Sequence, residues 1–119
     1  MTPQGVMDGL QAKNRELSSK NDELIRLSED AAQKKRDYLV AMTSKITELR
    51  IGGESITLIR DLVKGDKYVA ELQYKWDIAE GVLMACRERI KDLRESIGTY
   101  RSILTWLRTE LELTPSQEH

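Results

Sequence analysis

Residues 72–111, LQYKWDIAEGVLMACRERIKDLRESIGTYRSILTWLRTEL, decide the fold, because apolar side chains recur there at alternating steps of four and three residues without a break. These apolar positions, called the seam below, are Leu72, Trp76, Ala79, Leu83, Cys86, Ile90, Leu93, Ile97, Tyr100, Leu104, Leu107 and Leu111. Helical residues three and four apart share one face, and a mean step of about 3.5 keeps that face turned toward a neighbouring helix. The pattern therefore predicts one long helix whose apolar seam another helix must cover.

The rest of the chain supplies the covering helix. Nothing between the two prolines, Pro3 and Pro115, forbids helix, and glycines interrupt the pattern at Gly52-Gly53 and at Gly65. The predicted segments are a first helix over about 3–50, a connector over about 51–65, a second helix over about 66–113 and a disordered tail over 114–119. Because the connector is apolar, at Ile56, Leu58, Ile59, Leu62 and Val63, we expect a short helix that folds back over the open end of the pair.

The first helix carries a thinner apolar row than the second. The row consists of Leu10, Leu17, Leu24, Leu27, Ala31, Tyr38, Met42, Ile46 and Leu49. An isolated helix needs tertiary packing to persist, so we expect residues 1–15 to fray or to be ordered only by a partner. The predicted fold class is all-α: a long antiparallel helical hairpin, coiled-coil-like, forming a single elongated domain over 1–119 that assembles into a multi-helix bundle.

Composition argues against several classes of function. Charged residues make up 33% of the chain and the net charge is -1, so no general attraction to nucleic acid or anionic lipid is expected. No run of 18 apolar residues and no signal-peptide pattern occurs, so we expect no membrane contact and a cytoplasmic location. Cys86, the only cysteine, lies on the seam and is interpreted as a small buried hydrophobe rather than a catalytic thiol.

The sequence lacks the residue patterns that catalysis and cofactor binding need. The only histidine is His119, so no Ser–His–Asp or Cys–His arrangement is expected. Glu-x-x-His is absent, and Gly52-Gly53 is not followed by the Gly-Lys-Ser/Thr of a phosphate loop. We therefore predict no enzyme activity, no catalytic residues, no metal and no cofactor.

Two rows of charge repeat every seven residues. The basic row is Arg87, Arg94, Arg101 and Arg108, and the acidic row of the first helix is Glu16, Glu23, Asp30 and Asp37. In an antiparallel hairpin centred near residue 62, the predicted pairs are Asp37–Arg87, Asp30–Arg94, Glu23–Arg101 and Glu16–Arg108. The basic row has two readings, a row of interhelical salt bridges, which we favour, and a phosphate-binding rail with steps of about 10 Å.

The second helix has more apolar surface than one neighbour can cover. Ile78, Val82 and Ala85 lie beside the seam near its start and are expected to receive the connector helix. Ile103, Trp106 and Leu113 lie beside the seam near its end, where the opposing part of the first helix has few apolar residues. Exposed Trp with aliphatic neighbours commonly marks an interface, so we predict an oligomer or partner interface there. The alternative is that Trp106 lies flat over its own hairpin.

The C-terminal half of the chain resembles small phage and prophage proteins of uncharacterised function. The resemblance rests on the connector TLIRDLVKG (57–65), on Ala79-Glu80-Gly81, and on the closing element RSILTWLR (101–108). It implies a phage accessory protein, encoded near replication or recombination functions, and makes Arg101, Trp106 and Arg108 the first residues to test for a shared interaction. Secreted WXG-type hairpins have the same predicted shape, but no Trp-x-Gly occurs at the turn.

These observations favour a non-enzymatic helical interaction protein of phage or prophage origin. It would self-associate as a homodimer or higher oligomer and bind a protein partner in the cytoplasm. The alternative is a nucleic-acid-binding accessory factor in phage replication or recombination that uses the basic row.

Overall fold

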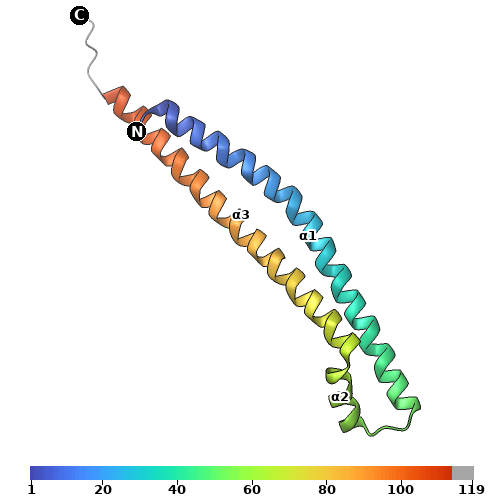
Figure 1. Ribbon diagram of the computed structural model, residues 1–119. Coiled ribbons are helices and arrows are strands. Elements are labelled where there is room, and N and C mark those ends of the chain that lie inside the picture. Colours follow the sequence, from blue (N-terminus) through green and yellow to red (C-terminus); the bar gives the residue numbers. More distant parts are fainter. Residues whose placement is uncertain (114–119) are drawn as a thin grey trace, which may run out of the picture. The chain divides into compact units, whose positions relative to one another are not determined.

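The computed structural model describes residues 1–113, and among these it contains three helices and no strand (Figure 1). The helices are α1 (Pro3–Ile51), α2 (Ile56–Gly65) and α3 (Lys67–Leu113). The predicted all-α class is confirmed, and both long helices begin and end within one residue of the predicted positions. The predicted tail 114–119 and the side chain of Leu113 lie outside the described residues.

The chain divides into two compact units, which are described separately. The turn unit is Leu24–Ala85, and the terminal unit is formed by Met1–Glu23 together with Cys86–His119. Each unit thus contains a segment of α1 and a segment of α3. The prediction of a single domain over 1–119 stays a prediction.

In the turn unit, α1 and α3 run antiparallel and α2 lies beside the end of α1 and the start of α3 (Figure 1). Lys45 of α1 contacts Asp66 at the start of α3, and further along the Tyr38 ring stacks on Trp76 with centroids 5.4 Å apart. Lys35 Nζ lies 5.8 Å from the centroid of the same Trp76 ring. Increasing residue numbers on α3 therefore match decreasing numbers on α1, as the predicted antiparallel hairpin requires.

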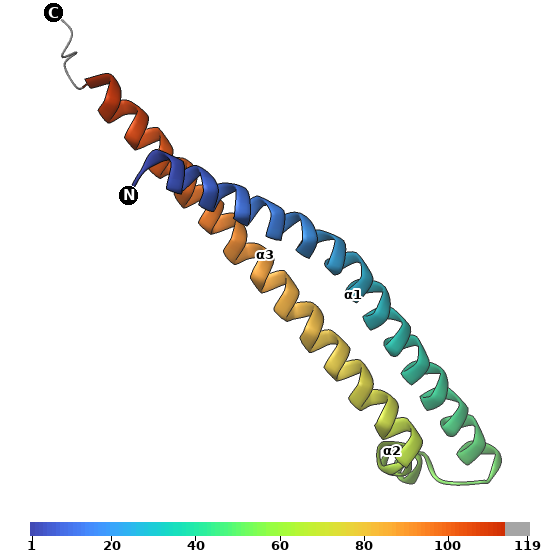
Figure 2. The ribbon, with the colours of Figure 1, turned by 45° about the horizontal axis from the view of Figure 1, so that its top comes forward.

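In the terminal unit, the first turns of α1 lie along the last part of α3 (Figure 2). Gly9 is so close to Tyr100 that a Cβ atom there would lie 2.8 Å from the Tyr100 ring. Further along, Cys86 Sγ lies 3.6 Å from the Lys20 carbonyl oxygen. The pairing is again antiparallel, and the lack of a side chain at Gly9 lets the two helices approach.

Two adjacent glycines end α1 where the sequence predicts it. Gly53 has φ +82°, and its N–H donates to the Arg50 carbonyl at 3.1 Å, while Glu54 N–H donates to the Leu49 carbonyl at 3.1 Å. These two bonds form a Schellman motif, which satisfies carbonyl groups at the helix end and favours glycine at the left-handed position. Gly53 is the residue that needs this conformation.

Side-chain caps begin the next two helices. Ser55 Oγ accepts a hydrogen bond from Leu58 N–H at 3.3 Å, and Asp66 Oδ2 accepts one from Val69 N–H at 3.0 Å. The N–H donated by Val69 lowers the pKa of Asp66, partial burial opposes this shift, and Lys45 adds to it. A capping carboxylate satisfies a backbone donor that has no partner within the helix, so Asp66 fixes the start of α3.

The core of the turn unit combines all three helices. Ala41 of α1, Ile59 and Val63 of α2, and Val69 of α3 are buried together. Partly buried side chains surround this cluster: Tyr38, Met42, Ile46, Leu49 and Leu72. The connector therefore forms a helix that folds back onto the pair, as predicted.

The predicted docking place of the connector helix is wrong. Ile78 and Val82 remain 48% and 46% exposed, and Ala85 is exposed too. The reason is the length of the connection, because a single residue, Asp66, separates α2 from α3. Ile78 lies about 18 Å further along α3 at the helical rise per residue, so α2 packs on the first turns instead.

The seam is buried along most of its length. Ala79 and Leu83 are buried in the turn unit, and Cys86, Ile90, Leu93 and Ile97 are buried in the terminal unit. Leu72, Trp76, Tyr100, Leu104 and Leu107 are half-buried. These positions confirm the prediction from the spacing.

Leu111 is the exception, since it is 68% exposed. Gly9 lies against Tyr100, and α1 begins only six residues before Gly9, whereas Leu111 lies eleven residues after Tyr100. Because the helices run antiparallel, Leu111 extends past the first turn of α1. The seam continues in the sequence beyond the helix that covers it.

The start of α1 is more ordered than its sequence suggests. The sequence predicts that residues 1–15 fray or are ordered only by a partner, whereas the structure is helical from Pro3 and buries Val6, which is 2% exposed. Thr2 Oγ1 accepts a hydrogen bond from Gly5 N–H at 3.0 Å and so caps the helix. The predicted row begins at Leu10 and omits Val6, although Val6 lies four residues before Leu10 and so shares its helix face.

Candidate interaction interface

Within the terminal unit, the charge pairing inferred from the heptad rows is wrong at Glu16. Glu16 does not pair with Arg108: its carboxylate accepts two hydrogen bonds from Arg89, from Nε and from Nη2, both at 2.7 Å. These bonds lower the pKa of Glu16 against the opposing effect of partial burial, and they raise the pKa of Arg89. Among the described residues, this ion pair between α1 and α3 is shorter than Lys45–Asp66, and it uses an arginine outside the predicted row.

The other predicted acidic partners bond within α1. Glu23 accepts a hydrogen bond from Lys20 at 2.9 Å, and Asp37 accepts one from Gln33 Nε2 at 2.9 Å. Asp30 pairs with Lys34, four residues further along the same helix, at 3.7 Å. The predicted register fails because α1 extends past the start of α3: Lys45 already lies opposite Asp66, and the last turns of α1 pack beside α2.

The basic row is exposed on α3 in the terminal unit. Arg87, Arg94, Arg101 and Arg108 are all exposed, and none forms an ion pair with an acidic residue of the part of the chain that the structure describes. Lys91 is also exposed and lies on the same helical stripe, one turn from Arg87 and from Arg94. Neither reading of the row, interhelical salt bridges or a phosphate-binding rail, is tested by these contacts, and both stay predictions.

Two of the three predicted interface residues line one shallow groove on α3. The groove has a volume of about 600 Å³ and is lined by Glu95, Gly98, Thr99, Ser102, Ile103 and Trp106. We call it the Trp106 groove. Trp106 is 61% exposed and no residue of α1 lines the groove, which favours an interface over a Trp covered by its own hairpin. The third predicted residue, Leu113, has its side chain outside the described residues.

The hydroxyl groups on the floor of the Trp106 groove already have hydrogen-bond acceptors within the helix. The Thr99 hydroxyl donates to the Glu95 carbonyl at 3.1 Å, and the Ser102 hydroxyl donates to the Gly98 carbonyl at 3.0 Å. Since both hydroxyl protons are used within the helix, an apolar surface can cover these residues without leaving a donor unpaired. Gly98 has no side chain, and a Cβ atom there would meet nothing within 4 Å, so the groove has open space at this position.

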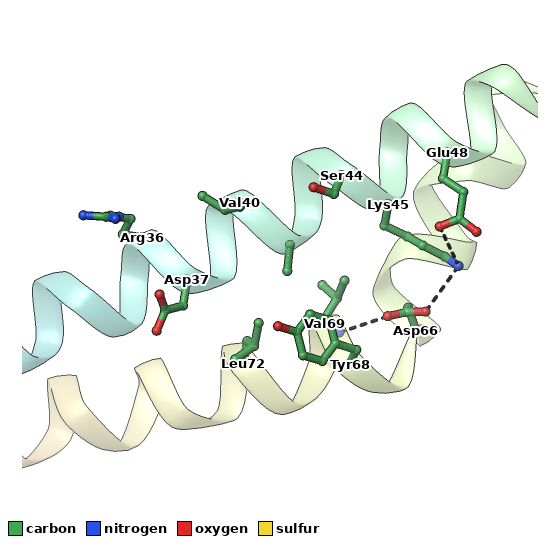
Figure 3. A pocket seen from close by; sticks show the side chains of 11 residues that line it. Arg36, Asp37, Val40, Ser44, Lys45, Glu48, Asp66, Tyr68, Val69 and Leu72 are labelled. Atoms are coloured by element: carbon green, nitrogen blue, oxygen red, sulfur yellow. Dashed lines mark hydrogen bonds and ion pairs between the residues drawn. The ribbon is translucent and has the colours of Figure 1, made fainter.

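The turn unit contains a polar groove with a different character. It has a volume of about 720 Å³, and Lys45 crosses it to reach Glu48 and Asp66, each at 3.5 Å (Figure 3). Arg36, Asp37, Tyr68 and other residues line the rest of it. Both carboxylates that face Lys45 are engaged, one of them as a helix cap, so we assign this groove a structural role. The sequence analysis missed these contacts because no local pattern connects Lys45 with Asp66.

The described residues contain no cluster of His, Cys, Asp or Glu that could hold a metal ion. Cys86 is buried, and its thiol donates to the Lys20 carbonyl. None of the helices that the structure describes has the length and hydrophobicity to cross a membrane.

No protein-family model, curated protein or solved structure matches this chain. The resemblance to phage proteins therefore stays a prediction. The arguments about function that follow rest on the residues and their arrangement.

Proposed function

We propose that the chain is a non-enzymatic helical interaction protein that self-associates through the Trp106 groove and binds a further protein partner. The observation that supports self-association most strongly is the exposure of Trp106 beside a groove formed by α3 alone. A phage or prophage origin and a cytoplasmic location belong to the same proposal, and the sequence resemblance supports the origin.

The order of residues along the groove suits a two-fold antiparallel contact. Gly98 and Trp106 lie four residues on either side of Ser102. In an antiparallel crossing centred on Ser102, Trp106 of one copy would lie over Gly98 of the second copy, and the reverse. A two-fold interface uses the same patch on both copies, so one large and one small residue complement each other twice. Trp is also enriched among the residues that dominate binding energy.

Sedimentation equilibrium of the wild-type chain and two variants tests this proposal. We expect the wild-type chain to dimerise at tens of micromolar, and both Trp106→Ala and Gly98→Leu to sediment as monomers with unchanged helical circular dichroism. Gly81→Leu is the matched control, because a Cβ atom at Gly81 also meets nothing within 4 Å and Gly81 lies in the turn unit. A monomeric wild-type chain over that range, or dimers of both variants, would contradict the proposal.

A second candidate function is binding of single-stranded nucleic acid. It is supported by the exposed basic row, whose guanidinium groups are not neutralised by acids of the described chain. Neutralising backbone phosphates makes affinity fall steeply with salt. If this function holds, Arg94→Glu/Arg101→Glu abolishes binding of an oligothymidylate and removes its salt dependence. The control Lys67→Glu/Lys75→Glu, with the same charge change in the turn unit, should retain both.

A further inference from the structure

The turn unit contains an apolar pocket that neither the seam nor the basic row predicts. It has a volume of about 570 Å³ and lies between the end of α1, one side of α2 and the start of α3. Met42 and Ile46 of α1, Ile56 and Ile59 of α2, and Val69 of α3 form its walls. Ile56 is 74% exposed, so a large aliphatic side chain at this pocket remains open to an occupant.

The rim of this pocket is cationic. Arg50 of α1 and Arg60 and Lys64 of α2 line it, and no carboxylate does. All three cations are exposed, and none is ion-paired with an acid within residues 1–113. The nearby carboxylates Glu48 and Asp66 face Lys45 in the polar groove instead (Figure 3). The pocket therefore combines apolar walls with a positively charged rim that contains no carboxylate.

We propose that this pocket, called the α2 pocket, binds an acidic amphipathic helix of a protein partner. The proposal deepens the proposed function, since it rests on the chain binding a partner and states that partner's chemistry. Helix-in-groove recognition places large apolar side chains at steps of three and four residues into a groove. Carboxylates flanking such a stripe would face the rim cations, and complementary charge fixes the orientation and speeds the encounter.

The spacing of the cations favours a helix over a small anionic amphiphile. Arg60 and Lys64 lie one helical turn apart, about 6 Å along α2, which matches carboxylates four residues apart on a partner helix. Arg50 comes from a different helix and adds a third cation. A fatty acid carries one carboxylate, so it would leave two of the three cations without a partner.

Fluorescence anisotropy with a synthetic probe peptide tests the proposal. The probe is a labelled helical peptide of about 18 residues with leucines at steps of three and four and glutamates flanking them, a length of about five turns. We expect saturable binding to the full chain, weakened at least about tenfold by Arg60→Glu/Lys64→Glu, as expected for paired interfacial charges. The matched control Arg36→Glu/Lys75→Glu carries the same charge change on exposed residues outside the pocket and should bind within about twofold of wild type.

Two further measurements separate the contributions. Ile56→Ser removes an exposed apolar wall residue and should weaken the probe without lowering helicity, whereas a probe with lysine in place of glutamate should not bind. Equal binding by both double variants, or saturable binding of dodecanoate without binding of the probe, would overturn the proposal. Gly98→Leu should bind the probe like wild type, so failure of self-association and failure of the α2 pocket can be told apart.

Discussion

The two units bury the apolar faces of α1 and α3 with different numbers of helices. In the turn unit α2 adds Ile59 and Val63 to the α1–α3 pair, and caps at Ser55 and Asp66 fix where the helices begin. The terminal unit has two helical segments among its described residues, and buries the seam of α3 against Val6 and the half-buried side chains of α1. The third helix covers only the first turns of α3, because Ile78 and Val82 in the turn unit stay 48% and 46% exposed, and Trp106 in the terminal unit stays 61% exposed.

The same comparison explains why the two units offer different surfaces. The third helix of the turn unit closes the core but creates the α2 pocket at its edge, with a cationic rim. The terminal unit leaves one face of α3 open, where the Thr99 and Ser102 hydroxyls already donate within the helix and Glu95 lies at the same groove. The two proposals therefore use different units, the terminal unit for self-association and the turn unit for partner binding.

The largest expected effect comes from truncating the terminal unit's core. Leu93 is 0% exposed, so Leu93→Ala should lower the free energy of unfolding by about 2–5 kcal/mol, through lost burial and the cavity left behind. Urea denaturation followed by circular dichroism measures this. Leu111→Ala, at the exposed end of the seam, should change it by less than about 0.5 kcal/mol. Equal losses would mean that the seam is packed beyond the start of α1.

Truncating a buried side chain of α2 should weaken the packing of this third helix in the turn unit. Ile59→Ala should cost about 2–4 kcal/mol, because the ten-residue α2 has few other buried side chains. Amide hydrogen exchange should show protection lost first in Ile56–Gly65, while the segment Cys86–Ile97 keeps its own. Loss of protection in both places together would show that the two units unfold as one.

A smaller effect is expected at the turn. Gly53→Ala places a Cβ atom on a residue with φ +82° and should cost about 1–2 kcal/mol. Gly81→Ala should instead stabilise the chain by about 0.5–1 kcal/mol, since it lies within α3 with open space at its Cβ position. Thermal unfolding of both variants gives the comparison, and a neutral Gly53→Ala would contradict the Schellman motif.

The smallest effect is expected on acidification. Asp66 in the turn unit and Glu16 in the terminal unit both have a pKa below their ordinary values of 3.8 and 4.5. Their stabilising contributions are therefore fully present above those ordinary values, and they are lost as the pH falls through the lowered pKa of each group. Melting temperatures of wild type, Asp66→Asn and Glu16→Gln between neutral pH and about pH 2 should converge at the acid end. A wild-type advantage that persists there would contradict the pKa shifts.

Much of the fold could be predicted from the sequence because the signals are local and repeated. The spacing from Leu72 to Leu107 and the glycines at positions 52, 53 and 65 identify both long helices and the turn. The register could not be predicted, because any two heptad rows pair consistently at every offset and exposed ion pairs are too weak to select one. The structure sets it through packing between residues far apart in the chain, namely the burial of Ala41 with Val69 and the close approach of Gly9 to Tyr100.

The candidate sites differ in the same way, since one could be predicted from the sequence and the other could not. Ile103 and Trp106 could be found from the sequence because they are apolar residues beside an already complete seam. The α2 pocket could not, since it exists only when α2 packs beside Met42 and Val69 and brings Arg50 near Arg60. A site built from three helices leaves no spacing pattern in any one of them.

The fluorescence of Trp106 tests the account most directly. In a Trp76→Phe background, which keeps an aromatic ring against Tyr38, Trp106 is the only Trp of the chain. We expect its emission to shift to shorter wavelength, and its quenching by acrylamide to fall, over the same concentrations at which sedimentation shows dimers forming. A Trp106 that stays equally quenchable while dimers form, or a chain that never dimerises, would contradict the assignment of the Trp106 groove.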